Sequence, residues 1–389
     1  MNIIIFDLAG YDVVGGCEKY LSILADHFSI KNKVTFIASK HFVFFLRCFY
    51  FVLTMGKSKF RPAQTTERNI GNTTLGEVTL MSLIPFSPQN IRVKKLLSLA
   101  DVIYSKNEFQ DLFTLYYLLG KKQYSQKVVV GTHTAIFVPS MFVGLWKKIH
   151  DLLYEGNLYK KFLVNSKLIH VPNSDYIDLI SDAYDVDKKK IIYIPYFIDW
   201  KTNMVGRKKQ DKFRILWAGR LSEQKGLDRL KNIIDLLSKY KSFEDMEIVI
   251  AGHGGIEFVN ELKGKYKNIN YLGLVSDMYS LYQSIDICMV TSYWETFGYN
   301  ALEPQSFGLP VVSFDIAGPR DIIKNNETGF LVNNEKTFSE KIIYYYELKR
   351  NAHQLFDKVK KAAYENSHME FGKNEIFKDL ESKIFTSGS

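Results

Sequence analysis

The chain has 389 residues, of which 46% are hydrophobic and 24% are charged. This length is too great for one ordinary hydrophobic core, and the composition is that of a globular, soluble protein, so two domains are expected. The net charge is +9, and residues 1–200 hold 24 Lys and Arg against 17 Asp and Glu. This imbalance indicates either a solvated basic surface or an anionic partner, such as nucleic acid, a lipid headgroup or a phosphorylated substrate.

The cysteines and the first residues bear on the cellular compartment. Cys17, Cys48 and Cys288 are odd in number, and their spacing fits neither a disulfide framework nor a zinc site. A reducing cytosol is therefore expected. The chain enters an apolar run at Asn2, so no signal peptide is predicted.

Short β-branched runs alternate with longer helical patterns along the whole chain. Parallel sheets covered by helices on both faces produce such alternation. We therefore predict an α/β chain with two Rossmann-like domains whose parallel sheets face each other across a cleft. The expected limits are residues 1–195 and 213–370, with a linker over 196–212 and a helical tail over 371–389 that crosses back to the first domain. The predicted strands are 2–7, 33–38, 101–104, 127–132, 168–172 and 191–195 in the first half, and 213–219, 246–251, 269–274, 285–291, 311–315 and 328–332 in the second.

One apolar segment has two interpretations. Residues 42–55 carry a single charge, Arg47, and Lys57, Lys59 and Arg61 follow at once. Fourteen residues are too few to span a bilayer, which takes about 20. The segment is either a buried core helix or an interfacial helix that docks on anionic lipid. No motif assigns a role to the region 40–125.

Two turns that follow predicted strands of the first half carry candidate ligand-binding residues. Gly15 and Gly16 precede a helical pattern, so the backbone there admits close approach of a ligand and the helix N-terminus favours an anion. The spacing is not that of the dinucleotide fingerprint. His133 ends the run Val128–His133, where it is either structural or functional.

The second half carries cations and glycines on comparable turns. Gly219 ends an apolar strand, and Arg220 and Lys225 follow before the next helix, where cations suit a diphosphate. Gly252 and Gly254 follow the next strand.

The most informative stretch is Ser292–Gly308. Glu295 lies in a predicted strand-to-helix loop, and Glu303 follows eight positions later, about two helical turns on. Carboxylates accept hydrogen bonds from vicinal hydroxyls, while the amides of a helix N-terminus, near Phe297 and Gly298, face an anion. A sugar, a diphosphate and a ribose fit this description.

This stretch resembles the Glu-x7-Glu signature of the retaining family 4 glycosyltransferases (glycosyltransferase group 1), which have the GT-B fold and include bacterial surface-polysaccharide enzymes. The resemblance is strong over about 213–332 and loose before that. It implies that Glu295 holds hydroxyls of the donor sugar, that Glu303 holds the ribose, and that the Phe297 and Gly298 amides bind sugar or phosphate.

Other motifs are similar to elements of the same family, and the resemblance assigns their roles. The Gly219-Arg-Leu…Lys225-Gly element implies that Arg220 and Lys225 neutralise the leaving diphosphate. His133 would face the donor sugar. The remaining implied donor-binding residues are Gly15 and Gly16 beside the diphosphate, and Gly252, Gly254 and Val275 near the nucleotide base.

Two positions depart from the family pattern. The family's interdomain Pro-Asn-Gly-Val-Asp stands here as Pro195-Tyr-Phe-Ile-Asp199, without the glycine of the usual turn. Pro304 follows the second glutamate and is tolerated only early in a helix, so that helix is expected to begin later or to kink.

The resemblance implies a retaining transferase that moves a hexose from a UDP-sugar or GDP-mannose to a saccharide acceptor, in surface-polysaccharide, O-antigen or capsule synthesis. We expect no cofactor, no metal and no nucleic-acid partner. The basic first half favours a lipid-linked acceptor and a cytoplasmic enzyme held peripherally on the inner face of the cell membrane. The alternatives are a nucleotide-binding module without turnover and a transferase acting on a soluble or protein acceptor.

Overall fold

A computed structural model describes residues 1–8, 16–39, 74–78, 83–134, 136–137, 144–198 and 211–385. Contacts divide the chain into two units. The first unit comprises Met1–Pro172, Tyr176–Ile194 and Asp379–Ser389, and the second comprises Asn173–Asp175 and Pro195–Lys378.

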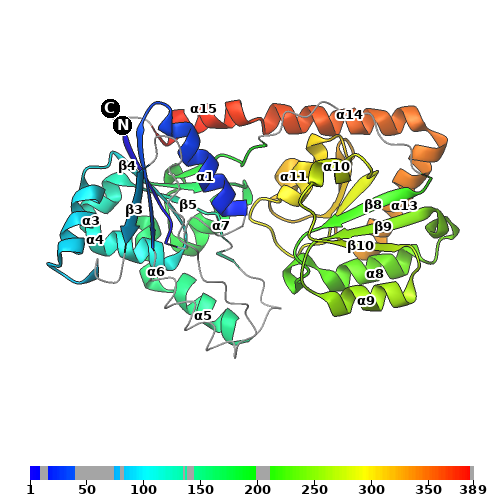
Figure 1. The fold of residues 1–389 in the computed structure, drawn as a ribbon, viewed down its shortest axis with the longest axis horizontal. Helices are drawn as coiled ribbons and strands as arrows, with labels where there is room; N and C mark the ends of the chain where they lie inside the picture. Colours follow the sequence, from blue (N-terminus) through cyan, green and yellow to red (C-terminus); the bar gives the residue numbers. More distant parts are fainter. Residues whose placement is uncertain are drawn as a thin grey trace. The chain divides into compact units, whose positions relative to one another are not determined.

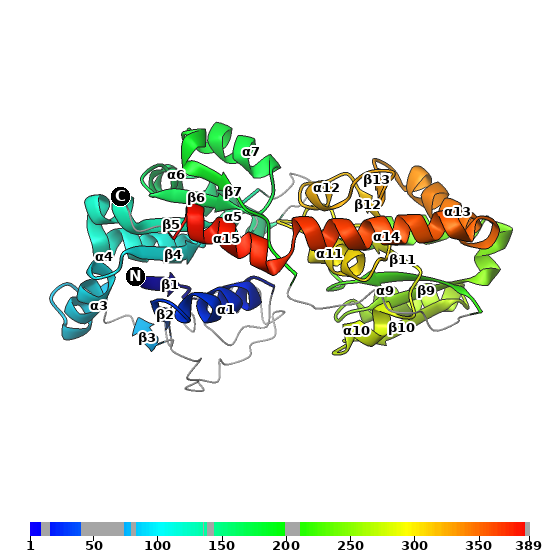
Figure 2. The same cartoon turned by 90° about the horizontal axis from the view of Figure 1, so that it is seen from above.

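The first unit contains a parallel sheet of seven strands in the order β3-β2-β1-β4-β5-β6-β7. The sequence analysis predicted six of these strands and missed β3, which lies at the outer edge beside β2 (Figure 2). Its sequence, Thr-Leu-Gly-Glu-Val, offers no apolar run for a pattern to detect. The strands are β1 (Asn2–Phe6), β2 (Lys33–Ser39), β3 (Thr74–Val78), β4 (Val102–Lys106), β5 (Val128–Gly131), β6 (Leu168–Val171) and β7 (Ile191–Tyr193).

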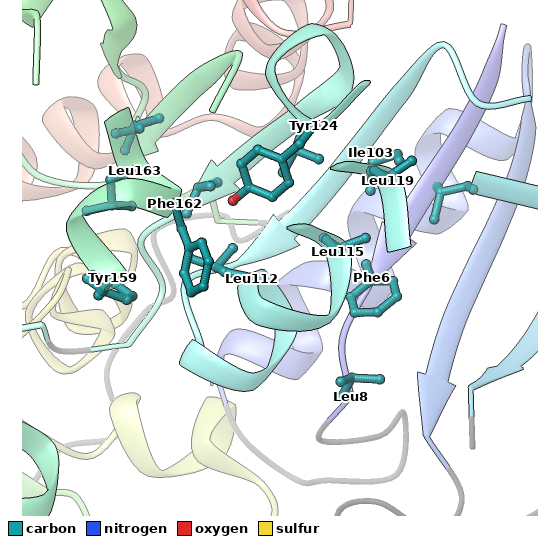
Figure 3. Packing of buried hydrophobic residues seen from close by; sticks show 14 of the residues in the cluster. Phe6, Leu8, Ile103, Leu112, Leu115, Leu119, Tyr124, Tyr159, Phe162 and Leu163 are labelled. Carbon is teal, nitrogen blue, oxygen red and sulfur yellow. The ribbon is translucent and has the colours of Figure 1, made fainter. Parts of the chain in front are cut away.

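Helices cover both faces of this sheet (Figure 1). Side chains alternate along a strand, so Ile4 and Phe6 of β1 point to one face. They pack there with leucines of α4 and with Phe162 of α6 (Figure 3). On the other face lies α1, whose Phe28 contacts Phe385 near the C-terminus with ring centroids 4.1 Å apart. The helices are α1 (Gly16–Ser29), α3 (Pro88–Ser98), α4 (Phe109–Lys127), α5 (Leu145–Tyr154), α6 (Asn157–Val164) and α7 (Asp175–Tyr184).

The second unit contains a parallel sheet of six strands in the order β10-β9-β8-β11-β12-β13. All six strands were predicted. They are β8 (Phe213–Ala218), β9 (Met246–Ala251), β10 (Ile269–Gly273), β11 (Ile287–Val290), β12 (Val311–Phe314) and β13 (Gly329–Val332).

The helices of the second unit bury one apolar stripe each against this sheet or against each other. Leu230, Ile233, Ile234 and Leu237 of α8 are fully buried, at the 3.6-residue period of the sequence. α8 packs with α13, and α11 packs with α14. The helices are α8 (Leu227–Leu237), α9 (Ile256–Lys265), α10 (Met278–Tyr282), α11 (Tyr299–Ser306), α12 (Pro319–Ile322), α13 (Glu335–Asn351), α14 (His353–Glu370) and α15 (Lys373–Lys383), which continues into the first unit.

Strand order reverses at one point in each sheet, between β1 and β4 in the first and between β8 and β11 in the second. Loops at the carboxyl ends of strands beside such a point diverge and leave room for a ligand. The residues singled out from the sequence follow these strands and their neighbours. No helix in the described part of the chain combines the length and the apolar character needed to cross a membrane.

Candidate functional site

An ion pair between Lys225 and Glu295 lies at the carboxyl edge of the second sheet. Nζ of Lys225 donates to Oε1 of Glu295 at 2.5 Å, and the two side chains are 17% and 10% exposed. Ser292 Oγ and Asn300 Nδ2 donate to the same Oε1, at 2.7 and 3.3 Å. No residue that the structure describes binds Oε2. The carboxylate is therefore held through one oxygen, and its other oxygen is available to accept from a ligand.

The backbone around Lys225 is fixed by neighbouring strands. Trp217 of β8 donates its indole N–H to Thr291 Oγ1 at 2.8 Å, and that hydroxyl donates to the Lys225 carbonyl at 2.7 Å. Gly226 has φ +68°, and a Cβ there would overlap the carbonyl of Thr291. Only glycine both adopts this conformation readily and permits this approach. The loop after β8 is thereby held against the loop after β11.

The loops after β8 and β9 meet through two glycines. The Gly219 amide donates to Ala251 O, the last residue of β9, at 2.9 Å. A Cβ on Gly252 would overlap the Gly219 carbonyl, and one on Gly254 would lie 3.2 Å from Leu221 O. Between them, Arg220 is exposed and makes no hydrogen bond or ion pair with any residue that the structure describes. Val275, half-buried, follows β10 on the adjacent loop.

Gly298 caps the N-terminus of α11 with φ +103°. The amides of Phe297 and Gly298 donate to none of the described acceptors, although the Phe297 side chain is buried. Glu303, in the second turn of α11, accepts from the Tyr282 hydroxyl at 3.2 Å. Two amides and two carboxylates thus border one helix end.

The expectation for Pro304 is corrected in part. The helix begins directly after Gly298 and not later, with Pro304 as its sixth residue. It ends two residues beyond the proline, where Gly308 has φ +72° and Leu309 N donates to Pro304 O. A short helix leaves little backbone for the proline ring to disrupt.

His133 of the first unit is buried with Tyr104 and His170. The Tyr104 hydroxyl lies 2.9 Å from His133 Nε2 and 2.6 Å from His170 Nδ1. Tyr20 of α1 packs on His133, with ring centroids 5.0 Å apart. Burial, with His170 and Lys106 nearby, holds the pKa of His133 well below its usual value, and burial lowers the pKa of His170 to about 4. Both imidazoles are therefore neutral at pH 7.

A buried ion pair lies at the same edge of the first sheet. Lys106 Nζ at the end of β4 is 3.0 Å from Asp7 Oδ1, which follows β1, and both side chains are at most 3% exposed. Asp111 accepts from the Leu8 amide at 3.3 Å. Burial, together with the charge of Asp7, raises the pKa of Asp111 well above its usual value. The switch point of the first sheet is therefore polar, as is that of the second.

Some predicted residues lie outside the described part of the chain. These are Gly15, Asp199 and the segment 42–61, whereas Gly16 is the first residue of α1. Within the described residues, no group of three His, Cys, Asp or Glu side chains is arranged to hold a metal ion. The metal-free mechanism stays a prediction, as do the individual roles of the site residues.

Residues 199–365 match the family model for glycosyl transferases group 1. This match assigns residues 199–365 to the group 1 glycosyltransferases. The matched range contains the Lys225–Glu295 pair, Arg220 and Glu303, so the family sequence pattern and the site geometry coincide.

Two curated relatives match more than half of this chain. An uncharacterized 41.2 kDa protein in the cps region of Klebsiella pneumoniae is 26% identical over 297 residues, covering 70% of this chain and 79% of that one. A UDP-Gal:alpha-D-GlcNAc-diphosphoundecaprenol alpha-1,3-galactosyltransferase of Escherichia coli is 27% identical, covering 58% of this chain and 66% of that enzyme. Two other curated relatives are matched over only 41% and 42% of their lengths.

A solved structure shares the fold over almost the whole chain. Anabaena Alr3699/HepE in complex with UDP superposes with a TM-score of 0.71 at 18% identity, covering 99% of this chain and all of that one. The prediction of an α/β GT-B protein with two Rossmann-like, parallel-sheet domains is confirmed.

Sequence reasoning missed the residues that position the predicted ones. Ser292 and Asn300 hold Glu295 from three positions before and five after it, and their nearness in sequence was a signal that could have identified them. Thr291 and Trp217 carried no motif. Tyr104 and His170 lie on separate strands, 29 and 37 residues from His133 in sequence, and only the sheet brings the three together.

Proposed function

We propose that this group 1 glycosyltransferase transfers a hexose from a nucleoside diphosphate sugar to a saccharide acceptor, with retention of anomeric configuration. The observation that carries the proposal is the Lys225–Glu295 pair, which holds a carboxylate by one oxygen beside a lysine and the exposed Arg220. The carboxylate suits sugar hydroxyls and the two cations suit a diphosphate.

The proposed reaction uses these groups in one displacement. The bond from the anomeric carbon to the diphosphate oxygen breaks, and a bond to the acceptor oxygen forms on the same face of the sugar. The acceptor proton passes to the departing phosphate oxygen, so no protein base is needed. Arg220 and Lys225 stabilise the negative charge that develops on the diphosphate, and this stabilisation grows toward the transition state.

In this proposal, different groups of the site bind the sugar, the ribose and the phosphate of the donor. Oε2 of Glu295 accepts from sugar hydroxyls, and Glu303 accepts from the ribose. The Phe297 and Gly298 amides, which donate to no described acceptor, face the sugar or phosphate at the start of α11.

A binding and turnover comparison tests this assignment. Glu303→Ala should weaken binding of UDP or GDP by roughly tenfold or more, since a hydrogen bond to a charged group contributes about 1.5–3 kcal/mol. Glu327→Gln, an exposed glutamate of the same unit, is the control and should bind as wild type does. Nucleotide binding by Glu303→Ala at wild-type strength would refute the ribose assignment. Binding without any transfer or hydrolysis of UDP- or GDP-sugars by the wild type would favour a non-catalytic module.

We also propose that the reaction needs no metal ion. Lys225 and Arg220 supply two positive charges for the diphosphate, which makes a divalent cation redundant. Activity should persist in EDTA. Complete loss in EDTA with recovery on adding manganese would contradict the proposal.

The proposed acceptor is a lipid-linked saccharide of surface-polysaccharide synthesis. Two observations support it: the E. coli relative named above is described by a diphosphoundecaprenol-linked acceptor, and residues 1–200 hold the excess of positive charge. The segment 42–61, interpreted above as either a core helix or an interfacial helix, lies outside the described residues. α5 offers a further surface, since Leu145 and Leu152 are 56% and 77% exposed and Lys148 lies between them. A helix face of leucines with lysine suits an anionic membrane surface.

Vesicle co-sedimentation tests this peripheral association. The protein should partition onto anionic vesicles more than onto neutral ones, and should dissociate as salt rises. Leu152→Asp should reduce partitioning, whereas Leu179→Asp, an exposed leucine on α7, should not. Equal partitioning onto both vesicle types, or none at low salt, would point to a soluble acceptor.

A further inference from the structure

The guanidinium of Arg229 joins the first turn of α8 to the loop that follows β11. Its Nη1 donates to the carbonyl oxygen of Ser292 at 3.0 Å. Its central carbon lies over two aromatic rings, 3.9 Å from the ring centroid of Tyr293 and 4.0 Å from that of Phe314. Phe314, at the end of β12, is buried and packs on Phe338 of α13. The arginine therefore ties this loop to the hydrophobic core of the second unit.

Neighbouring residues hold the same loop at two further points. The Tyr293 amide donates to the Gln224 carbonyl at 2.9 Å, and the Tyr293 hydroxyl donates to the Asp228 carboxylate. The loop before α8 and the first turn of that helix thus form one support for the loop after β11. The supported loop includes Ser292, whose hydroxyl donates to Oε1 of Glu295 at 2.7 Å. The orientation of the carboxylate therefore depends on where this loop is held.

Arg229 occupies a helical position that does not favour a cation. It is the third residue of α8, and the N-terminal end of a helix carries a partial positive charge. The contacts that Arg229 makes outside α8 therefore account for an arginine here. A guanidinium is planar, so it stacks on aromatic faces while its N–H groups donate in the plane, whereas the ammonium of a lysine has no plane to stack.

We infer that Arg229 is a positioning residue for Glu295. It fixes the Ser292 carbonyl, so that the Ser292 hydroxyl stays directed at Oε1 and the carboxylate keeps one orientation before the donor binds. Such pre-organisation lowers the barrier of a reaction that needs an exact geometry. This last step rests on the proposed function, because it takes Glu295 to bind the donor sugar. The hold of Arg229 on the loop does not depend on that function.

Amide hydrogen exchange of the full-length protein tests the hold on the loop directly. Arg229→Met keeps the aliphatic length but removes the hydrogen bond and the guanidinium. We expect the peptide containing Ser292–Glu295 to exchange about tenfold faster, while β8 keeps its wild-type protection. The control Arg350→Met removes an arginine that lies over the Tyr346 ring and binds Asp245, and it should change neither peptide. Unchanged exchange in Arg229→Met, or faster exchange throughout the second unit, would overturn the inference.

A double-mutant cycle connects the loop to turnover. Arg229→Met should lower kcat/KM for the sugar donor by about tenfold, whereas UDP alone should bind as tightly as to wild type. Ser292→Ala removes the hydroxyl through which Arg229 acts, so adding Arg229→Met to it should lower kcat/KM by less than about threefold. Arg229→Lys should restore kcat/KM only in part. Additive losses in the cycle, or full activity of Arg229→Met, would refute the positioning role. If wild-type protein transfers no sugar, the proposed function fails, while hydrogen exchange still decides whether Arg229 holds the loop.

Discussion

The two polar sites of this chain lie at equivalent places in their sheets and are built on opposite principles. The site of the second unit uses ionised groups: the side chains of Lys225 and Glu295 are 17% and 10% exposed, and Arg220 is exposed. In the first unit the neutral side chains of His133, Tyr104 and His170 are joined by hydrogen bonds in the interior, at the same edge of the sheet as the buried Lys106–Asp7 ion pair. A charged site can neutralise a diphosphate, whereas a neutral one can discriminate hydroxyls without attracting anions.

The two sites also differ in how they are held. Glycines at positive φ bring the loops of the second unit together, as Gly226 does beside Thr291. The first site is held by side chains from separate strands that point toward one another. The geometry of the charged site should therefore be sensitive to backbone changes within one loop. The geometry of the neutral site should be sensitive to substitutions on any of several strands.

Breaking the ion pair should have the largest effect. Lys225→Met leaves Glu295 held by Ser292 and Asn300 but removes a cation from the diphosphate. We expect kcat to fall by 10²–10³, equivalent to about 3–4 kcal/mol of transition-state stabilisation. The control is Lys231→Met, which breaks an exposed ion pair between Lys231 of α8 and Glu261 of α9 and should leave kcat unchanged. Steady-state transfer kinetics measure both, and equal rates for Lys225→Met and wild type would remove the lysine from the mechanism.

A substitution that alters the backbone of the charged site should have the next largest effect, on stability. Gly226→Ala places a Cβ against the Thr291 carbonyl at φ +68° and should destabilise the second unit by about 3 kcal/mol. Gly264→Ala, in α9 with no atom within 4 Å of the new Cβ, should instead stabilise by up to about 1 kcal/mol. Denaturant unfolding of the two variants gives the comparison, and similar stabilities would show that the loop relaxes around the methyl group.

The difference between the two sites also explains which parts of the fold and of the candidate site could be predicted from the sequence. The sheet of the second unit follows from six apolar runs, and Gly219, Lys225 and Glu295 each lie in a short motif that the sequence shows. The ion pair between Lys225 and Glu295, which are 70 residues apart, was not predicted. The edge strand β3 contains Gly76 and Glu77 and was missed, since an edge strand needs less burial. The hydrogen bonds that join Tyr104 to His133 and to His170 could not be predicted, because they depend on strand order and on side-chain direction, and neither leaves a local pattern.

Acid should destabilise the first unit through its buried histidines His170 and His133. The pKa of His170 is about 4 in the folded protein and about 6.5 when unfolded. As pH falls below 6.5 the unfolded chain gains a proton that the folded chain does not, so stability falls until pH 4 and not below it. Between pH 7.5 and 5 this amounts to about 2 kcal/mol, and His133 adds in the same direction.

Unfolding free energies at both pH values measure this dependence. His170→Gln retains an N–H donor toward Ile194 and should reduce the loss of stability on acidification. His253→Gln, an exposed loop histidine, should keep the wild-type loss. An equal pH dependence in wild type and His170→Gln would mean that His170 is protonated in the folded protein at pH 5.

The smallest change in stability should come from Arg220→Ala, and this variant separates function from folding within the charged site. Arg220 is exposed and binds no described residue, so its loss should alter the unfolding free energy by less than about 0.5 kcal/mol. Arg220 nevertheless lies on the same loop after β8 as Lys225, where we propose that the diphosphate binds. We expect kcat to fall about tenfold, less than for Lys225→Met because solvent screens an exposed charge. Removing the Arg220 charge should also make turnover less sensitive to added salt. Turnover at the wild-type rate in Arg220→Ala would assign stabilisation of the leaving diphosphate to Lys225. A large loss of stability would instead show that the Arg220 side chain stabilises the fold.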